Sequence, residues 1–568
     1  MNRNSDKLLP ADLTPETVAS LYHELESMPL TNTNEVTEML ARWTNVEDAL
    51  GEAHAKLYIQ FSQNTGNEEF RKLLDSFIEE VEPVAEEACD RLNKLLMHNP
   101  VAKQYLETTE NAFFQQVKRR IEIFRQENVA VSASTEILSQ DHAELTGGLT
   151  ILYQDNTLTM EQAYALLEGN NRDNREEIYR LMLEKRIGIR TELHGLMDKL
   201  LKMRYQIAIN AGFKNYRDFR HFELERFDYS VADVVSLHGT IQQHFVPLAD
   251  KVMIRRKQLL GYSELMPWDL ATDPEMRAPL QPFHTAQELI EGGRETLYAI
   301  DLRLGQLLDE MEVNGHLDLE SRDKKASGAF SFNLPQSNAS FLFMNAAGTH
   351  DDVVTLMHEM GHALHDKLCG HHPFYFHKNF PMEVAELASM SLELISSSFW
   401  TPFYPEKTDL NRARVNLLEG VVLGLPWIAA VDEFQHWLYT HPEHSQSERD
   451  TAWTKIYKKY ACHEVCYAGV EEAFVFGWQH QSHIYEEPFY YIEYAIAQLG
   501  ALELWMHYQE QGDEALQQFF SALALGGQSS VTEIYRQAGL NFTFSESRIV
   551  KLAQFLGEQL DVAYAVKG

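Results

Sequence analysis

The sequence predicts a mostly α-helical protein with one small β-sheet. Three long segments, 84–98, 175–208 and 231–261, carry apolar residues at spacings of three and four, which is the pattern of amphipathic helices. Two short aromatic and apolar runs, 326–333 and 339–345, flank the turn-like sequence LPQSN. Such runs on either side of a turn predict a β-hairpin. Helices therefore dominate, and the hairpin is the exception.

The composition fits a large soluble protein. Of the 568 residues, 44% are hydrophobic and 23% are charged, which is ordinary for globular chains. The formal net charge is −35, and because phosphate backbones bind basic surfaces we expect no nucleic-acid partner. The longest uncharged apolar stretch, Gly420–Val431, contains Pro426 and is far shorter than the roughly 20 residues that span a bilayer. We therefore expect no membrane insertion.

The N-terminal segment and the cysteines both favour the cytoplasm. The first 22 residues lack the apolar region of a signal peptide. Four cysteines in so long a chain do not form a disulfide framework, so we expect a reducing compartment. Cys462 and Cys466, with His463 between them in ACHEVC, are a candidate structural zinc site. Buried free thiols are the simpler interpretation of that segment.

A helix with its own boundary signals is expected at 350–369. Thr349 can cap its N-terminus, with Asp352 three residues later completing a capping box. Gly370 is a suitable residue just beyond its end. The helix contains TLMHEMGHALHD, in which imidazoles and a carboxylate interrupt an apolar pattern. Burying such groups costs free energy unless they meet neighbours or a metal.

Two histidines of this helix have the spacing of metal ligands. His358 and His362 are four residues apart, about 6 Å along one face, so both rings can reach one ion. Glu359 is rotated by about 100° from His358 and flanks that ion, where a general base takes a proton from metal-bound water. His365 is about 10.5 Å along the axis from His358, too far to share the ion. We interpret His365 as a packing residue or as a support for a ligand.

The H-E-x-x-H pattern arises by chance often enough that a third ligand is needed. Pro381 can open a second helix, along which Glu383, Glu386 and Glu393 form one acidic stripe. Glu386 is the better ligand, because the helix dipole can explain Glu383 in the first turn. Glu393, two turns beyond Glu386, is placed to hold a ligating histidine by a hydrogen bond. A solvated acidic face is the alternative.

The HEMGH motif at 358–362, followed by Glu386 in VAELAS, resembles the zinc peptidase family of thimet oligopeptidase and oligoendopeptidase F. The strand–strand–helix run at 327–365 is similar to the run that leads into that family's metal site. Similarity covers roughly residues 140–565, whereas the first 130 residues share only helical character. Three further segments resemble the family: EGNNRDNREEIYRLM (168–182), PFYYIEYAIAQLGA (488–501) and LALGGQSSVTEIYRQAGLN (523–541).

The resemblance implies a prolate, almost entirely helical molecule with a deep central channel and one zinc ion on its floor. It also implies three zinc ligands and one general base, which are His358, His362 and Glu386 with Glu359 as the base. Residues 1–225 are expected to form a helical region that is one channel wall, and residues 226–568 a catalytic region with two lobes. The family cleaves short peptides and leaves folded proteins intact, because the channel admits only an extended chain.

The Tyr-rich segment at 483–494 contains hydrogen-bond donors that could stabilise a reaction intermediate. Attack on a peptide carbonyl creates an oxyanion, which needs hydrogen-bond donors aimed at it. The segment carries His483, Tyr490, Tyr491 and Tyr494, with Tyr490 and Tyr494 four residues apart on the expected helix. Aromatic stripes are usually core, yet buried tyrosine hydroxyls need partners. In the family a histidine and tyrosines of this region contact the substrate carbonyl, so all four are catalytic candidates.

These observations predict a zinc-dependent endopeptidase that cleaves internal bonds of short oligopeptides. An exposed edge of the hairpin can pair with an extended peptide, which gives broad sequence tolerance. One alternative is a carboxypeptidase or dipeptidyl carboxypeptidase of related fold, which needs a cationic residue for the substrate's C-terminal carboxylate. Another is a non-catalytic peptide-binding protein. The intact Glu359 counts against a binder, which has no use for a base.

Overall fold

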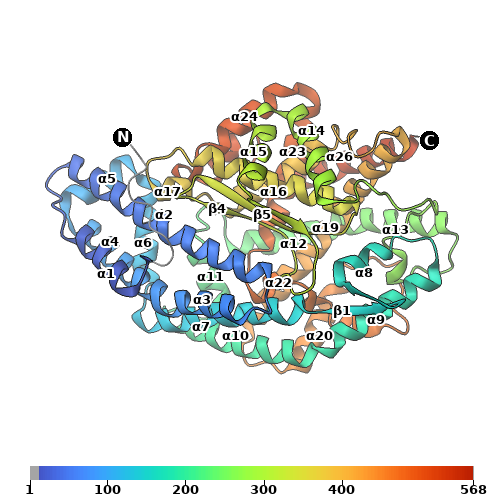
Figure 1. Cartoon of the computed structure of the whole chain (residues 1–568), viewed down its shortest axis with the longest axis horizontal. Helices are drawn as coiled ribbons and strands as arrows, with labels where there is room; N and C mark the ends of the chain where they lie inside the picture. Colours follow the sequence, from blue (N-terminus) through green and yellow to red (C-terminus); the bar gives the residue numbers. More distant parts are fainter. Residues whose placement is uncertain (1–11, 567–568) are drawn as a thin grey trace.

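Helices make up most of the chain in this computed structural model, which describes residues 12–566 (Figure 1). The predicted fold class, a mostly helical protein with one small sheet, is confirmed, and a second small sheet is present. Asparagine side chains begin several N-terminal helices, because Asn32, Asn67 and Asn99 each accept hydrogen bonds from the first-turn backbone. The N-terminal helices are α1 (Pro15–Glu26), α2 (Thr33–Gln63), α3 (Glu68–Ser76), the π-helical η2 (Phe77–Val81), α4 (Glu82–His98), α5 (Pro100–Thr109), α6 (Asn111–Ile123) and α7 (Gln126–Gly147).

A two-stranded hairpin that the sequence analysis missed follows α7. Its strands are antiparallel and joined at Gln154 and Asp155, both of which have positive φ. Such turns are usually marked by Asn-Gly or Asp-Gly, and this one contains no glycine. The elements of this part are β1 (Thr150–Tyr153), β2 (Asn156–Thr159), α8 (Met160–Leu166), α9 (Arg172–Gly188), α10 (Arg190–Asn210), α11 (Tyr216–Glu223), α12 (Val231–His244), α13 (Val246–Leu260), η3 (Pro267–Asp269), α14 (Ala286–Ile300) and α15 (Leu302–Val313).

The predicted hairpin is present and belongs to a three-stranded sheet. β4 (Phe330–Leu334) and β5 (Ala339–Ala346) pair antiparallel, with Phe330 opposite Phe343. A strand that was not predicted, β3 (Leu317–Glu320), pairs parallel to β5 on its other side. The order is therefore β3-β5-β4, and β4 and β3 are the two edges.

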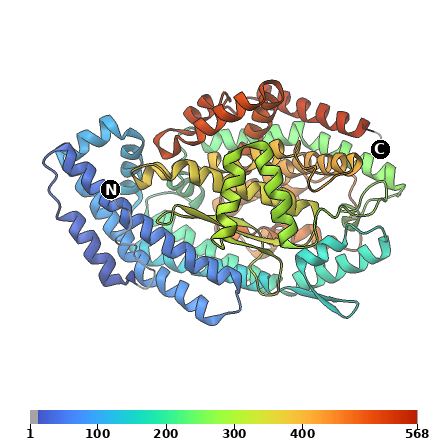
Figure 2. The same ribbon diagram turned by 45° about the horizontal axis from the view of Figure 1, so that its top comes forward.

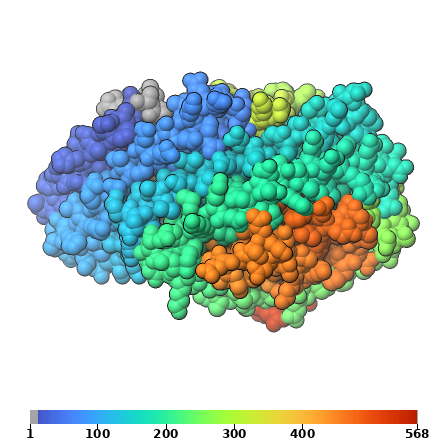
Figure 3. Space-filling model, turned by 90° about the horizontal axis from the view of Figure 1, so that it is seen from below, coloured from blue at the N-terminus to red at the C-terminus, as the bar shows by residue number. Residues whose placement is uncertain are grey.

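The remaining helices surround the sheet and complete the elongated molecule (Figures 1 and 2). Figure 3 shows one long face, where the early helices and the segment around α20 (orange) form a continuous surface. These helices are α16 (His350–Cys369), α17 (Tyr375–Lys378), α18 (Met382–Ser396), α19 (Lys407–Thr440), α20 (Gln446–Tyr457), α21 (Glu471–Val475), η4 (Gly477–His480), α22 (Ser482–Tyr485), α23 (Ile492–Gln511), α24 (Asp513–Leu523), η5 (Gly526–Gln528), α25 (Val531–Gln537) and α26 (Glu546–Ala565).

Two large hydrophobic cores hold the molecule together. One is formed by the N-terminal helices and includes Phe374, Tyr375 and Phe376 at α17. The other runs from Leu193 to Ala563 and contains the helices around the sheet. α17 therefore anchors the N-terminal helices to the rest of the chain. The expected division into 1–225 and 226–568 stays a prediction.

α19 is the one described helix that is long and apolar enough to cross a membrane, judged by length and composition. Within its most apolar window 67% of the residues are buried inside the protein. Pro426 lies inside this helix, between buried Leu425 and partly buried Trp427. Such burial is typical of the core helix of a soluble protein.

Candidate metal and catalytic site

The helix that carries the HEMGH motif begins as predicted. The Thr349 hydroxyl accepts a hydrogen bond from the Asp352 backbone N–H, and the Asp352 carboxylate accepts one from the Thr349 N–H. Gly370 ends the helix with φ of −62°, so it is not the left-handed residue that glycine often supplies. A Cβ there would lie 2.2 Å from the side-chain oxygen of Asn338, so that side chain would have to move.

Three side chains from α16 and α18 converge on one point. Nε2 of His358 lies 3.2 Å from Nε2 of His362 and 3.4 Å from Oε2 of Glu386. Nε2 of His362 lies 3.7 Å from the same carboxylate oxygen. Two imidazole nitrogens and one carboxylate oxygen are the donor set of catalytic zinc sites. These separations match those between ligands about 2.1 Å from a tetrahedral ion, so the residues fit a zinc ion.

A glycine between the two histidines permits this convergence. A Cβ on Gly361 would lie 2.5 Å from Cα of Ser389 and 2.7 Å from the Ala388 carbonyl oxygen. α16 and α18 are therefore in backbone contact at this position. Since Ser389 is one turn beyond Glu386, the same contact brings the Glu386 carboxylate to the histidines.

Neighbouring side chains hold these donors in place. Oε1 of Glu393 lies 2.6 Å from Nδ1 of His358, so Nδ1 carries the proton and Nε2 presents its lone pair. Glu386 accepts hydrogen bonds from Ser389 at 3.0 Å and from the Tyr490 hydroxyl. Burial favours the neutral acid, yet the imidazoles and the Tyr490 hydrogen bond outweigh it and lower the pKa of Glu386 to about 2. Glu386 is therefore a carboxylate.

Glu359 points into a dry environment beside the three donors. Its side chain is 3% exposed, and Oε2 has no hydrogen-bond partner among the residues that the structure describes. Burial raises the pKa of Glu359 to about 8. A carboxyl group with such a pKa can take up and release a proton near neutral pH, which is what a general base requires.

Two further polar residues of these helices, His365 and Glu383, are buried in contacts away from the three converging donors. The ring of His365 stacks on Phe380, with centroids 3.5 Å apart, and burial lowers its pKa to about 3. Of the two interpretations proposed for His365, the structure supports packing. Glu383 is 4% exposed and accepts a hydrogen bond from the Tyr229 hydroxyl at 2.7 Å. The alternative of a solvated acidic face is therefore wrong for Glu383, although it does lie in the first turn of α18.

His483 and Tyr494 face each other close to the converging donors. Nε2 of His483 lies 3.1 Å from the Tyr494 hydroxyl, and the ring of Tyr494 lies 6.4 Å from that of His358. Gln481 contacts the other nitrogen of His483, with its amide nitrogen 2.8 Å from Nδ1. Sequence reasoning missed Gln481, although it is two residues from a predicted catalytic histidine.

The other two tyrosines lie differently from expectation. Tyr490 and Tyr491 precede α23, which begins at Ile492, so the expected helical face of three tyrosines is wrong. Phe489 has φ of 66° and turns the chain just before them. The Tyr490 hydroxyl therefore binds Glu386, while its ring lies 5.8 Å from that of His483 and 5.5 Å from that of Tyr494. Tyr491 packs with its ring 5.1 Å from that of His483.

Several partly exposed acidic side chains lie near the edge strand β4. The side chain of Glu487 is 59% exposed, and burial raises its pKa. Glu136 of α7 is 43% exposed, and burial and neighbouring carboxylates raise its pKa to about 7. Tyr58 lies in the field of Glu487 and packs on Phe332 of the edge strand β4, at 5.3 Å between rings. Tyr58 thus connects these acidic side chains to the edge strand β4.

Two other groups of side chains in the described part of the chain have metal-like donor spacing. One joins His238 and His436 to the buried Asp432, whose Oδ2 lies 2.8 and 3.2 Å from their Nε2 atoms. Both histidines can donate to that oxygen, whereas Oδ1 of Asp432 and Nδ1 of His436 have no partner among the described residues. The other group is His54, Glu82 and Glu136.

The cysteine candidate is not among these groups. Cys462 and Cys466 are free, and His463 binds Asp250 at 2.8 Å. The two cysteines of ACHEVC are therefore free thiols, as the simpler interpretation proposed. The segment itself lies outside any helix.

Comparison with known proteins gives a consistent pattern along the whole chain. The family model of peptidase family M3 matches residues 165–552, and the model of the peptidase M3 N-terminal domain matches residues 15–124. The second match includes the region where sequence reasoning found only helical character.

Individual relatives agree with the family models. Oligopeptidase PepF of Bacillus subtilis is 21% identical over 92% of this chain and 80% of its own length. The plasmid oligoendopeptidase F of Lactococcus lactis subsp. cremoris is 24% identical over 68% of this chain and 63% of its own. The solved structure of Pz peptidase A with an inhibitor is 25% identical, with a TM-score of 0.91 over 98% of both chains.

Proposed function

Because the chain belongs to peptidase family M3 and is thus a metallopeptidase, we propose that it is a zinc-dependent endopeptidase that cleaves internal bonds of short oligopeptides. The convergence of His358, His362 and Glu386 beside the buried Glu359 carries this proposal. Named relatives are oligopeptidases, which supports short peptides as the substrate class.

We propose that His358, His362 and Glu386 hold the ion, with Glu393 and Tyr490 fixing two of these ligands. When bound, zinc supplies a Lewis acid that polarises the scissile carbonyl and makes a coordinated water more acidic. The Glu393 contact keeps the lone pair of His358 directed at the site, so little reorganisation is needed on binding.

Glu359 is the proposed general base. Its Oε2 has no hydrogen-bond partner among the described residues and is free to accept the proton of the attacking water. The resulting acid then donates that proton to the leaving nitrogen, which would otherwise depart as an unstable anion. Glu359 thus returns to its starting state after each cleavage.

Tyr494 and His483 are the proposed donors for the oxyanion. Their contact at 3.1 Å keeps both groups on one side of the site. A hydroxyl aimed at the developing negative charge interacts more strongly with the transition state than with the substrate. Tyr490, whose hydroxyl is bound to Glu386, supports the ligand in this proposal and is no longer an oxyanion donor.

The channel that the family resemblance implies would select short, extended peptides. A folded domain cannot reach a buried site, whereas a short chain can enter and pair with the edge of β4. The test is digestion of a mixed peptide library, read by mass spectrometry with and without a chelator. We expect internal cuts that the chelator abolishes, also in peptides blocked at both ends.

Other outcomes of that digestion would overturn the proposal. Efficient cleavage of a long denatured protein would contradict the channel, and removal of C-terminal dipeptides alone would favour the exopeptidase alternative. Binding without any cleavage would favour a peptide-binding protein. A cytoplasmic location remains part of the proposal, to be checked by cell fractionation.

A further inference from the structure

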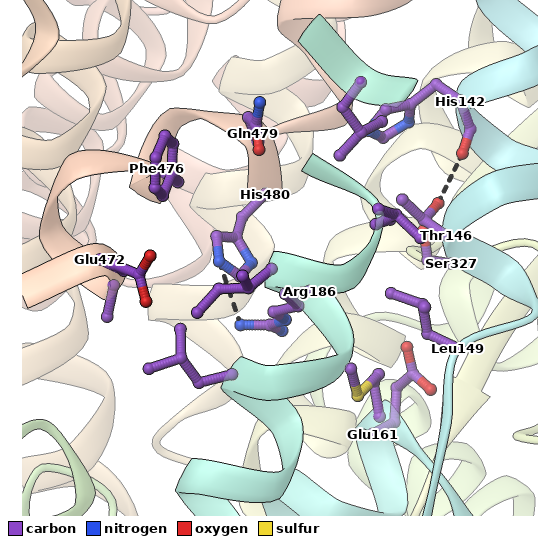
Figure 4. A pocket seen from close by; sticks show the side chains of 16 residues that line it. His142, Thr146, Leu149, Glu161, Arg186, Ser327, Glu472, Phe476, Gln479 and His480 are labelled. Atoms are coloured by element: carbon purple, nitrogen blue, oxygen red, sulfur yellow. Dashed lines mark hydrogen bonds between the residues drawn. The ribbon is translucent and has the colours of Figure 1, made fainter. Parts of the chain in front are cut away.

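A second cavity lies beside the proposed active site, and its walls carry an arginine that no acidic side chain neutralises (Figure 4). Its volume is about 120 Å³, and it lies between α7, α9, η4 and the segment just before β4. Most of its wall is apolar, with Leu149, Leu183 and Phe476 among the lining residues. Figure 4 shows the side chains of Arg186 and His480 meeting in this space.

Arg186 is half-buried and makes no ion pair with the described residues. Its one hydrogen-bond contact among the described residues is with Nε2 of His480, at 3.4 Å. By contrast, Arg175 lies 2.9 Å from the carboxylate of Asp269, and Arg226 lies 3.0 Å from that of Glu493. The chain has 84 acidic and 49 basic residues, so acidic partners are plentiful. Buried Arg204 has no acidic partner either, but it donates to the Tyr439 hydroxyl and to backbone carbonyls, whereas Arg186 has no such oxygen partner among the described residues.

The contact with His480 leaves the charge of Arg186 uncompensated. Burial and the charge of Arg186 lower the pKa of His480, so this imidazole is neutral and only accepts a hydrogen bond. Burial lowers the pKa of Arg186 as well, which reflects the cost of enclosing an unpaired cation. Two carboxylates also line the cavity: Glu472 pairs with Arg190 at 2.9 Å, and Glu161 acts on Arg186 only from a distance, with its carboxylate away from the guanidinium group in Figure 4.

The cavity is connected to the catalytic residues through η4 and α22. His480 is three residues before His483, so their Cα atoms are at most about 10 Å apart. His142, on the cavity wall, hydrogen-bonds Glu486 at 3.1 Å, one turn beyond His483. Ser327, also on the wall, is three residues before the edge strand β4. A peptide that pairs with β4 therefore passes this cavity within a few residues of the cleaved bond.

We propose that Arg186 binds a carboxylate of the peptide substrate in this cavity. The inference rests on the proposed peptidase function and specifies its substrates, which carry a carboxylate a few residues from the cleaved bond. The two possible sources are the C-terminal carboxylate and an Asp or Glu side chain, and both suit the forked donors of arginine. His480 then stops receiving the guanidinium hydrogen bond or shares it with the ligand.

The test compares four peptides of one sequence: free C-terminus or C-terminal amide, each with Glu or Gln at a position near the cleaved bond. Wild type, Arg186→Gln and the control Lys185→Gln are assayed for kcat and KM, and their melting temperatures are measured. Lys185 is the exposed neighbour of Arg186 and does not line the cavity, so its variant loses the same charge from the surface. We expect Arg186→Gln to lose about tenfold or more in kcat/KM, mainly through KM, for the peptide whose carboxylate is bound.

The pattern across the peptides identifies the source of the carboxylate. A loss confined to free-acid peptides supports the C-terminus, and a loss confined to Glu peptides supports the side chain. A loss equal for all four peptides, or no loss, would overturn the inference while leaving the peptidase proposal intact. Failure of the wild type to cleave any peptide would instead refute that proposal. If Arg186→Gln does not fold, Arg186→Lys is compared in the same way, and unchanged selectivity would then count against the inference.

Discussion

The amide nitrogen of Gln481 lies 2.8 Å from Nδ1 of His483, and this contact determines which nitrogen of the imidazole carries the proton. The indole N–H of Trp427 donates to the Gln481 oxygen at 3.2 Å. Since an indole can only donate, the oxygen of the amide faces Trp427 and its nitrogen faces His483. Nδ1 therefore accepts, and the proton of neutral His483 is on Nε2, directed at Tyr494.

Replacing Gln481 by glutamate should make catalysis sensitive to pH. A carboxylate accepts the proton of Nδ1 and raises the pKa of His483, which burial lowers in the wild type. Below the raised pKa the imidazolium still donates through Nε2, but above it the proton remains on Nδ1 and the donor is lost. We expect activity to fall as pH rises through that pKa, measured as kcat/KM between about pH 5.5 and 9.

A leucine variant is the control for this experiment. Gln481→Leu removes the contact without adding charge, so it should lower kcat and leave the shape of the pH profile unchanged. A wild-type profile in Gln481→Glu would show that Gln481 does not determine the tautomer of His483.

The hydroxyl of Tyr494 can be removed without removing its ring. If it donates to the oxyanion, Tyr494→Phe should reduce kcat by about 10²–10³-fold with little change in KM. The melting temperature should change little because packing is kept. Near-normal kcat in a destabilised variant would assign Tyr494 to the core and remove it from the mechanism.

The metal assignment predicts different effects for two glutamates of α18. Glu386→Ala should purify largely free of zinc, because it removes a proposed ligand. Glu383→Ala should retain about one zinc per chain and lose stability, since it breaks the buried contact with Tyr229. Metal content by mass spectrometry and melting temperature distinguish the two. Equal zinc content in Glu386→Ala and wild type would refute the ligand assignment.

A glycine substitution tests the close approach of α16 and α18. Gly361→Ala forces a Cβ to within 2.5 Å of Ser389, so the helices must separate and the donors move apart. We expect a lower melting temperature and weaker zinc retention. Gly195→Ala is the matched control, because this helical glycine has open space around it, and it should stabilise by up to about 1 kcal/mol.

Equal behaviour of the two glycine variants would contradict this account. Gly361 and Gly195 both lie inside helices, and both substitutions add one methyl group, so only the neighbouring atoms differ. Zinc content is the more informative measurement, because a general loss of stability leaves the donor geometry unchanged.

Local features of the sequence were sufficient to predict α16 and the β4–β5 hairpin that precedes it. The capping residues Thr349 and Asp352 and the spacing of His358 and His362 depend on neighbours within one or two turns, so a linear pattern contains them. The β1–β2 hairpin was missed because its turn residues, Gln154 and Asp155, do not include the glycine that usually marks such turns.

The sequence by itself determined the helical character, the histidine pair and the neighbouring base, because helix geometry places residues four apart on one face. Only the tertiary structure decided that Glu386 reaches the histidines, that Tyr490 supports it, and that Arg186 stands without an acidic partner. These are contacts between helices far apart in the chain. They depend on how closely α16 and α18 pack and on the turn before α23, which periodicity does not encode.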